Sequence, residues 1–326
     1  MSSPTPSGPT PSDPTPAIPP TSRAFALIVL MGAAAVLGLA PVFVRLTETG
    51  PAAAGFWRLL FALPLLLAFV GRPASLGGTG IGRPGKWMAL AGMFFALDMS
   101  FWHYGLHLTS VANATVLCNL TPVVVTLFAW VVLRQRPKSL FLVALVLSMV
   151  GAAAMALGAN HKGGDQSLLG DALSLSVTVW YAAYFLTIQA ARKTASAQRV
   201  MLWSTAVGAP LMLLAALIMS EQIIPTGPAG WAACIGLGLV HVAGQGGVAW
   251  ALGKLPATIT AVTILVQPVV AGLVSWWVFG ETLTPVQALG GALVLAAIVL
   301  AQWSTRKADA QTKTGVGSED PTPVNL

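Results

Sequence analysis

The sequence predicts an all-helical integral membrane protein in which ten transmembrane helices form two inverted five-helix repeats around a central cavity. Three observations lead to this prediction. Of 326 residues, 56% are hydrophobic and only 8% are charged, and the mean hydropathy of +0.77 lies far above the balance of a soluble globular domain. Apolar runs long enough to cross a bilayer recur along the chain. Basic residues separate these runs in a regular pattern.

Ten apolar runs of about 18 to 22 residues are each long enough to cross a hydrocarbon core of about 30 Å as a helix. Two of them carry a proline at an equivalent place, Pro122 and Pro268. Because proline removes a backbone hydrogen bond and kinks a helix, these two residues are candidate hinges, although helix packing alone is an alternative role. In chain order the runs cover approximately 25–45, 53–70, 87–106, 111–133, 140–158, 170–190, 200–220, 231–251, 257–279 and 286–303.

The positive charges support this number of spans. If the N-terminus is cytoplasmic, ten crossings place fourteen of the 17 Lys and Arg residues on the cytoplasmic side and only Arg45, Arg58 and Lys162 on or near the outer side. Cytoplasmic loops are enriched in Lys and Arg, so we expect a multi-pass protein of the cytoplasmic membrane with both termini inside. The net charge of +7 then needs no nucleic-acid partner, and no basic segment interleaved with aromatic residues offers a phosphate footprint.

Five spans in each half require the second half to enter the membrane from the opposite side, so the halves should be inverted repeats. Without a gap, "YGLHLTSVANATVLCNLTPVV" aligns with "WALGKLPATITAVTILVQPVV" at an offset of 146 residues, which superposes Pro122 on Pro268. The first 22 residues contain eight prolines, a composition typical of disorder. We therefore expect a disordered cytoplasmic tail at 1–23, a first repeat at 24–158, an outer connecting loop at 159–169, a second repeat at 170–303 and a disordered cytoplasmic tail at 304–326.

Four segments of the chain resemble the EamA-type transporters of the drug/metabolite transporter superfamily. They are "GFWRLLFALPLLL" in the second apolar run, "NLTPVVV" and "LVQPVVA" around the two prolines, and "FGETLTPVQALGGALVL" between the last two runs. The resemblance covers about 25–303 and is most recognisable at Gly280, Glu281, Thr284 and Pro285. It implies the ten-helix fold and the export of small metabolites, and no cofactor is expected.

The stretch "FALDMSFWHYGLHLTS" places an acidic residue, Asp98, in the third apolar run. At about 1.5 Å of rise per residue, Asp98 lies about 18 Å beyond Lys86 and therefore near the middle of the bilayer. An Asp at that depth costs about 2.5 to 3.5 kcal/mol, so it should face a cavity or a partner. Helical spacing predicts that Phe94 and Phe101 share its face, with Phe95 and Trp102 close beside it. Aromatic rings around a carboxylate suit an ammonium or another cationic group.

Counting residues in the same way places polar and aromatic side chains of other runs at a similar depth in the bilayer. We expect these side chains to line a site at the interface of the repeats. Each has an alternative role: the amides as hydrogen bonds between helices, the aromatic rings as packing, and the histidines as structural or proton-relaying groups. Arg58 could also reach the outer headgroups or pair with Asp98 or Glu48. The candidate substrate-binding residues are Arg58, Asp98, Trp102, His103, Asn119, Trp180, Tyr184, His241 and Gln267.

These features together predict a transporter that works by alternating access. Arg58 and Asp98 on opposite walls of the cavity would hold the carboxylate and the ammonium of an amino acid, with bulky or aromatic side chains favoured. Cationic drugs or quaternary ammonium compounds, exported in exchange for protons, are an alternative substrate class, because a carboxylate among aromatic rings suits them as well.

Two other classes of protein fit the sequence less well. An intramembrane enzyme could use Asp98, His103 and His241, but the sequence contains no His-Glu-x-x-His zinc motif, no nucleophile elbow around a serine and no phosphate-binding glycine loop. A scaffold would leave the charges near the bilayer midplane without a role. Cys118 and Cys234 lie in apolar runs without metal-ligand spacing. The expected partners are a small-molecule substrate and the lipid bilayer, with the chain acting as a monomer or homodimer and no metal bound.

Overall fold

The structure is a computed structural model that describes residues 23–108, 117–132, 134, 136–158, 168–280 and 284–315. Within these ranges every regular element is a helix. By length and composition, six of the described helical stretches could cross a membrane: Arg23–Leu46, Pro51–Val70, Leu168–Ala191, Ala197–Ile218, Pro228–Leu252 and Ala257–Phe279. Shorter apolar helices cover Thr121–Val131, Ser139–Ala154 and Pro285–Ala301.

The helices follow one another in the order of the apolar runs. In the first half they are α1 (Arg23–Leu37), α2 (Ala40–Leu46), α3 (Pro51–Val70), the short 3₁₀ helix η1 (Ala74–Leu76), α4 (Lys86–Leu108), α6 (Thr121–Val131) and α7 (Ser139–Gly158). In the second half they are α8 (Leu168–Ala191), α9 (Ala197–Ile218), α10 (Pro228–Val240), the π-helix η2 (His241–Gln245), α11 (Gly246–Leu252), α12 (Ala257–Thr263), α13 (Val266–Phe279) and α14 (Pro285–Gly315).

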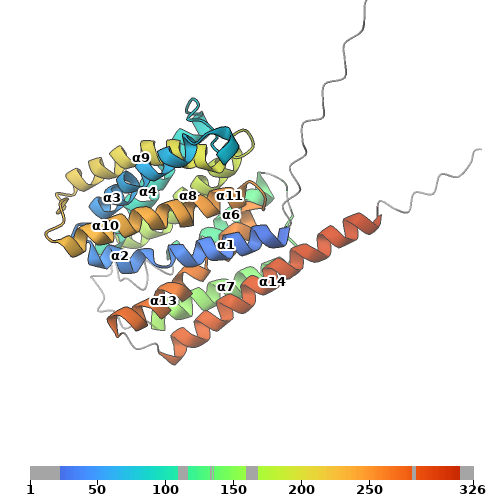
Figure 1. Ribbon diagram of the computed structural model, residues 1–326. Coiled ribbons are helices and arrows are strands. Elements are labelled where there is room, and N and C mark those ends of the chain that lie inside the picture. Colours follow the sequence, from blue (N-terminus) through green and yellow to red (C-terminus); the bar gives the residue numbers. More distant parts are fainter. Residues whose placement is uncertain are drawn as a thin grey trace, which may run out of the picture.

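Two groups of helices lie on either side of α1 and α2 (Figure 1). On one side α3 packs against α9 and α10, and α4 packs against α8 and α9. On the other side α7 packs against α14, with α13 beside both. The helices α6, α8 and α12 contact one another and join the two groups. The two halves of the chain therefore interleave, since helices of one half pack mainly on helices of the other.

Four of the expected spans are interrupted in the part of the chain that the structure describes. The first is broken at 38–39, between α1 and α2, and the ninth at 264–265, between α12 and α13, while the eighth contains the π-helical turn η2. The fourth has two turn residues, 119–120, just before α6. At the first break, a Cβ on Gly38 would lie 2.7 Å from Cβ of Val270 and 2.9 Å from the carbonyl oxygen of Gln267. The missing side chain of Gly38 thus lets the end of α1 approach the start of α13 closely.

At one end of the bundle, two acidic side chains cap helices reciprocally. Glu221, after α9, accepts hydrogen bonds from the backbone N–H groups of Ala52 at 3.2 Å and Ala53 at 2.8 Å, at the start of α3. Glu48, after α2, accepts one from the backbone N–H of Gly227 at 3.0 Å, just before α10. A carboxylate at a helix N-terminus satisfies free N–H groups and opposes the positive end of the helix dipole. The α2–α3 loop and the α9–α10 loop are therefore joined.

At the other end, the loop between α3 and α4 is held against α9. Arg199 donates hydrogen bonds to the carbonyl oxygens of Thr79 and Gly80, the latter at 3.2 Å. Trp203 Nε1 donates to the carbonyl oxygen of Ile81 at 3.1 Å. Gly80 has a φ of +67°, a conformation that favours glycine, and so the loop can turn there.

Helix α14 continues to Gly315, into the stretch at 304–326 that the sequence predicts as a tail. Half of the residues at 304–315 are Ala, Lys, Arg or Gln, which are good helix formers and favour continuation of the helix beyond its apolar part. The expected N-terminal tail, apart from Arg23, lies outside the described residues. So do most of the connecting loop at 159–169 and the first part of the fourth apolar run.

Candidate functional site

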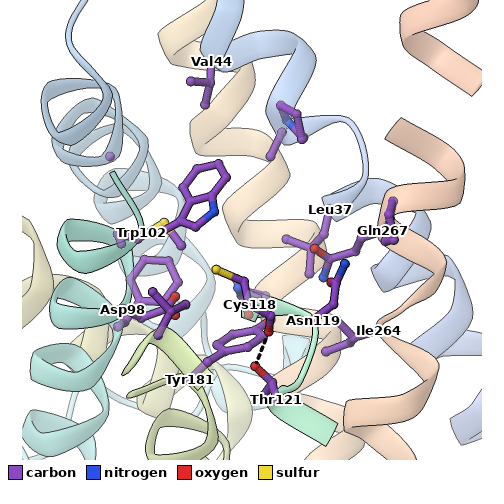
Figure 2. A pocket seen from close by; sticks show the side chains of 18 of the residues that line it. Leu37, Val44, Asp98, Trp102, Cys118, Asn119, Thr121, Tyr181, Ile264 and Gln267 are labelled. Atoms are coloured by element: carbon purple, nitrogen blue, oxygen red, sulfur yellow. Dashed lines mark hydrogen bonds between the residues drawn. The ribbon is translucent and has the colours of Figure 1, made fainter. Parts of the chain in front are cut away.

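A cavity of about 240 Å³ has walls from both halves of the chain. The first half contributes residues of α2, α3, α4 and α6, and the second half residues of α8, η2, α12 and α13. Figure 2 shows side chains from several of these elements pointing toward one space. Five predicted substrate-binding residues, and both candidate hinges, line it: Arg58, Asp98, Trp102, Asn119, Gln267, Pro122 and Pro268.

Asp98 is 2% exposed and lies on the face of α4 that borders the cavity, together with Phe95, Met99 and Trp102. These residues are three and four positions apart, so they form one stripe of the helix. Phe94 and Phe101, which were predicted on the same face as Asp98, are not among the residues that line the cavity. Their rings lie 6.2 Å and 5.6 Å from the ring of Trp180, in the contact between α4 and α8.

Arg58 approaches the cavity from α3, a neighbour of α4. Its side chain is 7% exposed, its Cζ lies 5.5 Å from the centre of the Phe95 ring, and its buried Nε has no hydrogen-bond partner. Its charge interacts with that of Asp98. Both charges border the cavity from helices that contact each other, α3 and α4.

Two interrupted helices form another wall of the cavity. Cys118 and Asn119 precede α6, and Ile264 and Leu265 precede α13. The two groups correspond under the offset of 146 residues that superposes the two candidate hinge prolines. Figure 2 shows Asn119 and Gln267 on this wall, across the cavity from Asp98.

Two amide groups on this wall bear buried donors without hydrogen-bond partners, Asn119 Nδ2 and Gln267 Nε2. A buried polar group normally finds a partner, and leaving one unpaired costs about 1 to 3 kcal/mol. Together with Arg58 Nε, the described part of the cavity therefore offers several donors to an acceptor-rich ligand.

The prediction missed two polar residues of the cavity wall, Tyr181 and Gln245. The hydroxyl of Tyr181 lies close to the side-chain amides of Gln245 and Gln267, and Tyr184 donates a hydrogen bond of 3.3 Å to Gln245 Oε1. In the sequence, Gln245 stands within "GQGG", which suggests helix packing. Its approach to the cavity depends on η2, whose irregular turn has no simple sequence signal.

Three predicted site residues lie behind the wall. Tyr184 is 2% exposed and His241 is also 2% exposed. The Nε2 atom of His241 is 3.0 Å from the hydroxyl of Thr205, and its ring lies 5.6 Å from that of Phe95. Trp180 packs in the contact between α4 and α8 described above. All three support the cavity wall rather than line it.

His103 lies on α4, but its side chain is outside the described part of the structure. Elsewhere in the described ranges, no group of three His, Cys, Asp or Glu side chains is placed to hold a metal ion.

Comparison with known proteins identifies the family. The model of the EamA-like transporter family matches two segments of the chain, residues 24–157 and 168–303. The chain belongs to the EamA-like transporter family. This EamA-like transporter is thus a multi-pass membrane protein, and the cavity lies among its helices.

Relatives of this EamA-like transporter agree with that assignment. An uncharacterized transporter of Archaeoglobus fulgidus is 30% identical over 278 residues, which cover 85% of this chain and 95% of that protein. The uncharacterized transporter YwfM of Bacillus subtilis is 27% identical over 204 residues, which cover 61% of this chain and 67% of that protein. A solved crystal structure has a TM-score of 0.72 at 17% identity, over 88% of this chain and 99% of that chain, and so shares the fold.

Proposed function

We propose that this EamA-like transporter exports a small zwitterionic metabolite, an α-amino acid with a bulky or aromatic side chain, from the cell. Its two inverted five-helix repeats would expose the cavity to each side of the membrane in turn. One observation carries the proposal: Arg58 and Asp98 line the same cavity from adjacent helices.

The presence of both charges in one cavity favours an α-amino acid. The ammonium and the carboxylate of such a molecule are bonded to one carbon atom, so a site that binds both needs its carboxylate and its guanidinium near each other. Arg58 suits a carboxylate because its planar guanidinium can donate two parallel hydrogen bonds. Asp98 is available to pair with the ammonium. Each buried charge would then be compensated by the substrate, which offsets part of the cost of placing it in the membrane.

The rest of the cavity supports a bulky apolar side chain. Beside the two charges lie Met99, Trp102 and Phe185, and such sites bury most of a small ligand against apolar and aromatic groups. At roughly 30 Å³ per water molecule, a volume of about 240 Å³ has room for a small metabolite. The unpaired donors of Asn119 and Gln267 add partners for the carboxylate oxygens.

Cationic drugs or quaternary ammonium compounds are the second candidate class. The observation that favours them is Asp98 beside the rings of Phe95 and Trp102, which suits a cation without a carboxylate. Arg58 argues against this class of substrate, because a cationic ligand brings no negative charge to compensate the guanidinium in the same cavity.

The test is uptake of labelled phenylalanine and tryptophan by proteoliposomes, with and without a proton gradient, for the wild type and for Asp98→Asn and Arg58→Gln. Removing one partner of a buried charge pair costs about 2 to 5 kcal/mol, so we expect either variant to lose at least tenfold in transport. The control is Asp171→Asn on α8, because Asp171 is a carboxylate that does not line the cavity.

Wild-type uptake that is saturable and is lost in both cavity variants would support the amino-acid proposal. Uptake equal in the wild type, Asp98→Asn and Arg58→Gln would contradict it. Transport of tetraphenylphosphonium that needs Asp98 and improves in Arg58→Gln would favour the cationic substrates instead. Dependence of wild-type uptake on the proton gradient would distinguish coupled transport from passive exchange.

A further inference from the structure

A second cavity, of about 500 Å³, lies where the ends of α6 and α8 meet the loop between α11 and α12. Three cationic side chains line it: Arg192, Lys193 and Lys254. Its other polar side chains, Gln189 and Thr258, are neutral, and among the described residues that line it none is acidic. The expected topology places this cavity on the cytoplasmic side of the membrane.

Arg192 is held in place within this cavity. Its Nε donates a hydrogen bond of 3.0 Å to the carbonyl oxygen of Ala249, and its Nη1 donates to that of Ala195. A Cβ on Gly253 would lie 2.7 Å from Nη2 of Arg192, so the glycine makes room for the guanidinium. Partial burial lowers the pKa of Arg192, yet a guanidinium remains charged at every physiological pH. The cavity therefore contains a fixed, partly desolvated cation.

The two lysines add mobile positive charge to this fixed cation. Lys193 and Lys254 are both exposed, and the Nζ atom of Lys254 lies 5.1 Å from the centre of the Trp250 ring. Gln189 ties the α11–α12 loop to α8, because its Nε2 donates a hydrogen bond of 3.3 Å to the carbonyl oxygen of Leu255. Together these groups make the site positively charged, and no acidic side chain among its described lining residues neutralises that charge. Such a site favours an anion.

An apolar surface borders the cavity. Ala129 of α6 lines the cavity, and the next residues expose large apolar side chains: Trp130 is 49% exposed, Val131 67% and Val132 58%. In a membrane protein such a surface faces the acyl chains of the lipids. A ligand with a phosphate group in the cavity and a hydrocarbon chain along α6 would therefore match both surfaces.

We propose that this cavity binds the phosphate group of an anionic lipid headgroup, with the acyl chains lying against α6. Arg192 would bind the phosphate oxygens through its remaining N–H groups, and Lys193 and Lys254 would add charge attraction from either side. Basic pockets between helices near a membrane surface recognise anionic headgroups in this way. Free phosphate shares the same headgroup chemistry, but it would leave the apolar surface of α6 without a partner. The proposal is independent of the substrate of the central cavity.

The test is native mass spectrometry of the purified, delipidated full-length protein titrated with phosphatidylglycerol, with phosphatidylcholine or with inorganic phosphate. We expect phosphatidylglycerol to bind more tightly than phosphatidylcholine. The double variant Lys193→Gln/Lys254→Gln changes only exposed side chains and should bind it at least fivefold more weakly. The matched control is Arg83→Gln/Lys86→Gln, which removes two exposed cations outside the cavity and should bind like the wild type.

Three results would overturn the lipid proposal: equal affinity for both lipids, an equal loss in the cavity and control variants, or strong binding of inorganic phosphate that abolishes the preference for phosphatidylglycerol. The last would identify free phosphate as the ligand of the same residues. A charge-reversal variant, Lys193→Glu/Lys254→Glu, gives a second measure. It should abolish the preference for phosphatidylglycerol while the melting temperature in phosphatidylcholine stays that of the wild type.

Discussion

Single residues set how closely the helices approach one another, and glycine makes the closest approaches possible. Gly92 on α4 faces α9, where a Cβ would lie 2.3 Å from the carbonyl oxygen of Ser204 and 2.9 Å from Cβ of Val207. Gly32 on α1, by contrast, has no atom within 4 Å of the position that a Cβ would take. The two glycines therefore have different roles, although both stand inside apolar helices.

We predict that Gly92→Ala destabilises the protein by about 1 to 3 kcal/mol, because the backbone of α9 must shift to admit the methyl group. Gly32→Ala should be neutral or slightly stabilising, because Ala has the better helix propensity and space is free. Thermal unfolding of both variants in the same detergent measures this difference. Equal melting temperatures for the two variants would contradict the assigned role of Gly92.

At the residue scale, the sequence predicted the charged and amide groups of the cavity better than the aromatic ones. Asp98 and Gln267 could be found because burying a polar group in a membrane is costly without a function or a partner. Trp180 could not be assigned correctly, because an aromatic ring is equally suited to a cavity and to a helix contact. The sequence also could not decide which aromatic ring of α4 borders the cavity, since Phe94 and Phe95 both lie near Asp98 along the helix and only packing selects Phe95.

At the scale of elements, the interruptions before α6 and α13 determine the shape of one cavity wall. Both precede a proline, Pro122 in α6 and Pro268 in α13, which cannot donate a backbone hydrogen bond to the preceding turn. A helix weakened at this point can bend at low cost, and both prolines border the cavity.

We predict that Pro122→Ala and Pro268→Ala lower the maximal transport rate severalfold while changing substrate affinity less than twofold, because the added hydrogen bond stiffens each hinge without touching the charged groups. Pro64→Ala is the control, since Pro64 lies inside α3 and outside the cavity. Rates and affinities measured in proteoliposomes separate the two effects. A change in affinity alone would assign the prolines to the binding surface.

Another prediction concerns which residues of α8 and of the interrupted helices are accessible from the cavity. In a background with Cys118→Ser and Cys234→Ser, Asn119→Cys and Gln267→Cys should react with a polar thiol reagent, because both positions line the cavity. Trp180→Cys should react much more slowly, because Trp180 packs against α4. Labelling rates followed by mass spectrometry test this contrast, and fast labelling at Trp180→Cys would place that face of α8 on the pathway.

The sequence predicted most elements at this scale but not their interruptions. A long apolar run indicates a membrane helix because the bilayer requires one. A break such as that at 38–39 depends on a close approach to another helix, and η2 depends on one irregular turn. These are tertiary features that a single apolar run does not encode.

At the scale of the whole molecule, the loops at one end form a connected unit. The α2–α3 and α9–α10 loops cap each other's helices through Glu48 and Glu221, and the backbone N–H of Gly50 donates to the carbonyl oxygen of Gln222 at 2.9 Å. A part of each half of the chain is thus fixed to the other at this end. Motion between the halves then has to occur mainly elsewhere in the bundle.

We predict that both termini lie in the cytoplasm, as an even number of spans and the distribution of basic residues require. Fusions of a cytoplasmically active fluorescent protein and of a periplasmically active phosphatase, at either terminus in a bacterial host, report the side directly. Fluorescence without phosphatase activity at both ends is the expected result. Termini on opposite sides would mean an odd number of crossings and would refute the inverted repeat of five spans.

A π-helical turn such as η2 corresponds to one additional residue within an α-helix. Deleting one residue there would restore regular geometry and rotate the following segment by about 100° relative to the preceding one. Gln245, at the end of η2, would then turn away from the cavity, whereas His241, at its start, would keep its place beside Thr205. The insertion or deletion of a single codon can therefore change which polar side chain faces this cavity during evolution, without any amino-acid substitution.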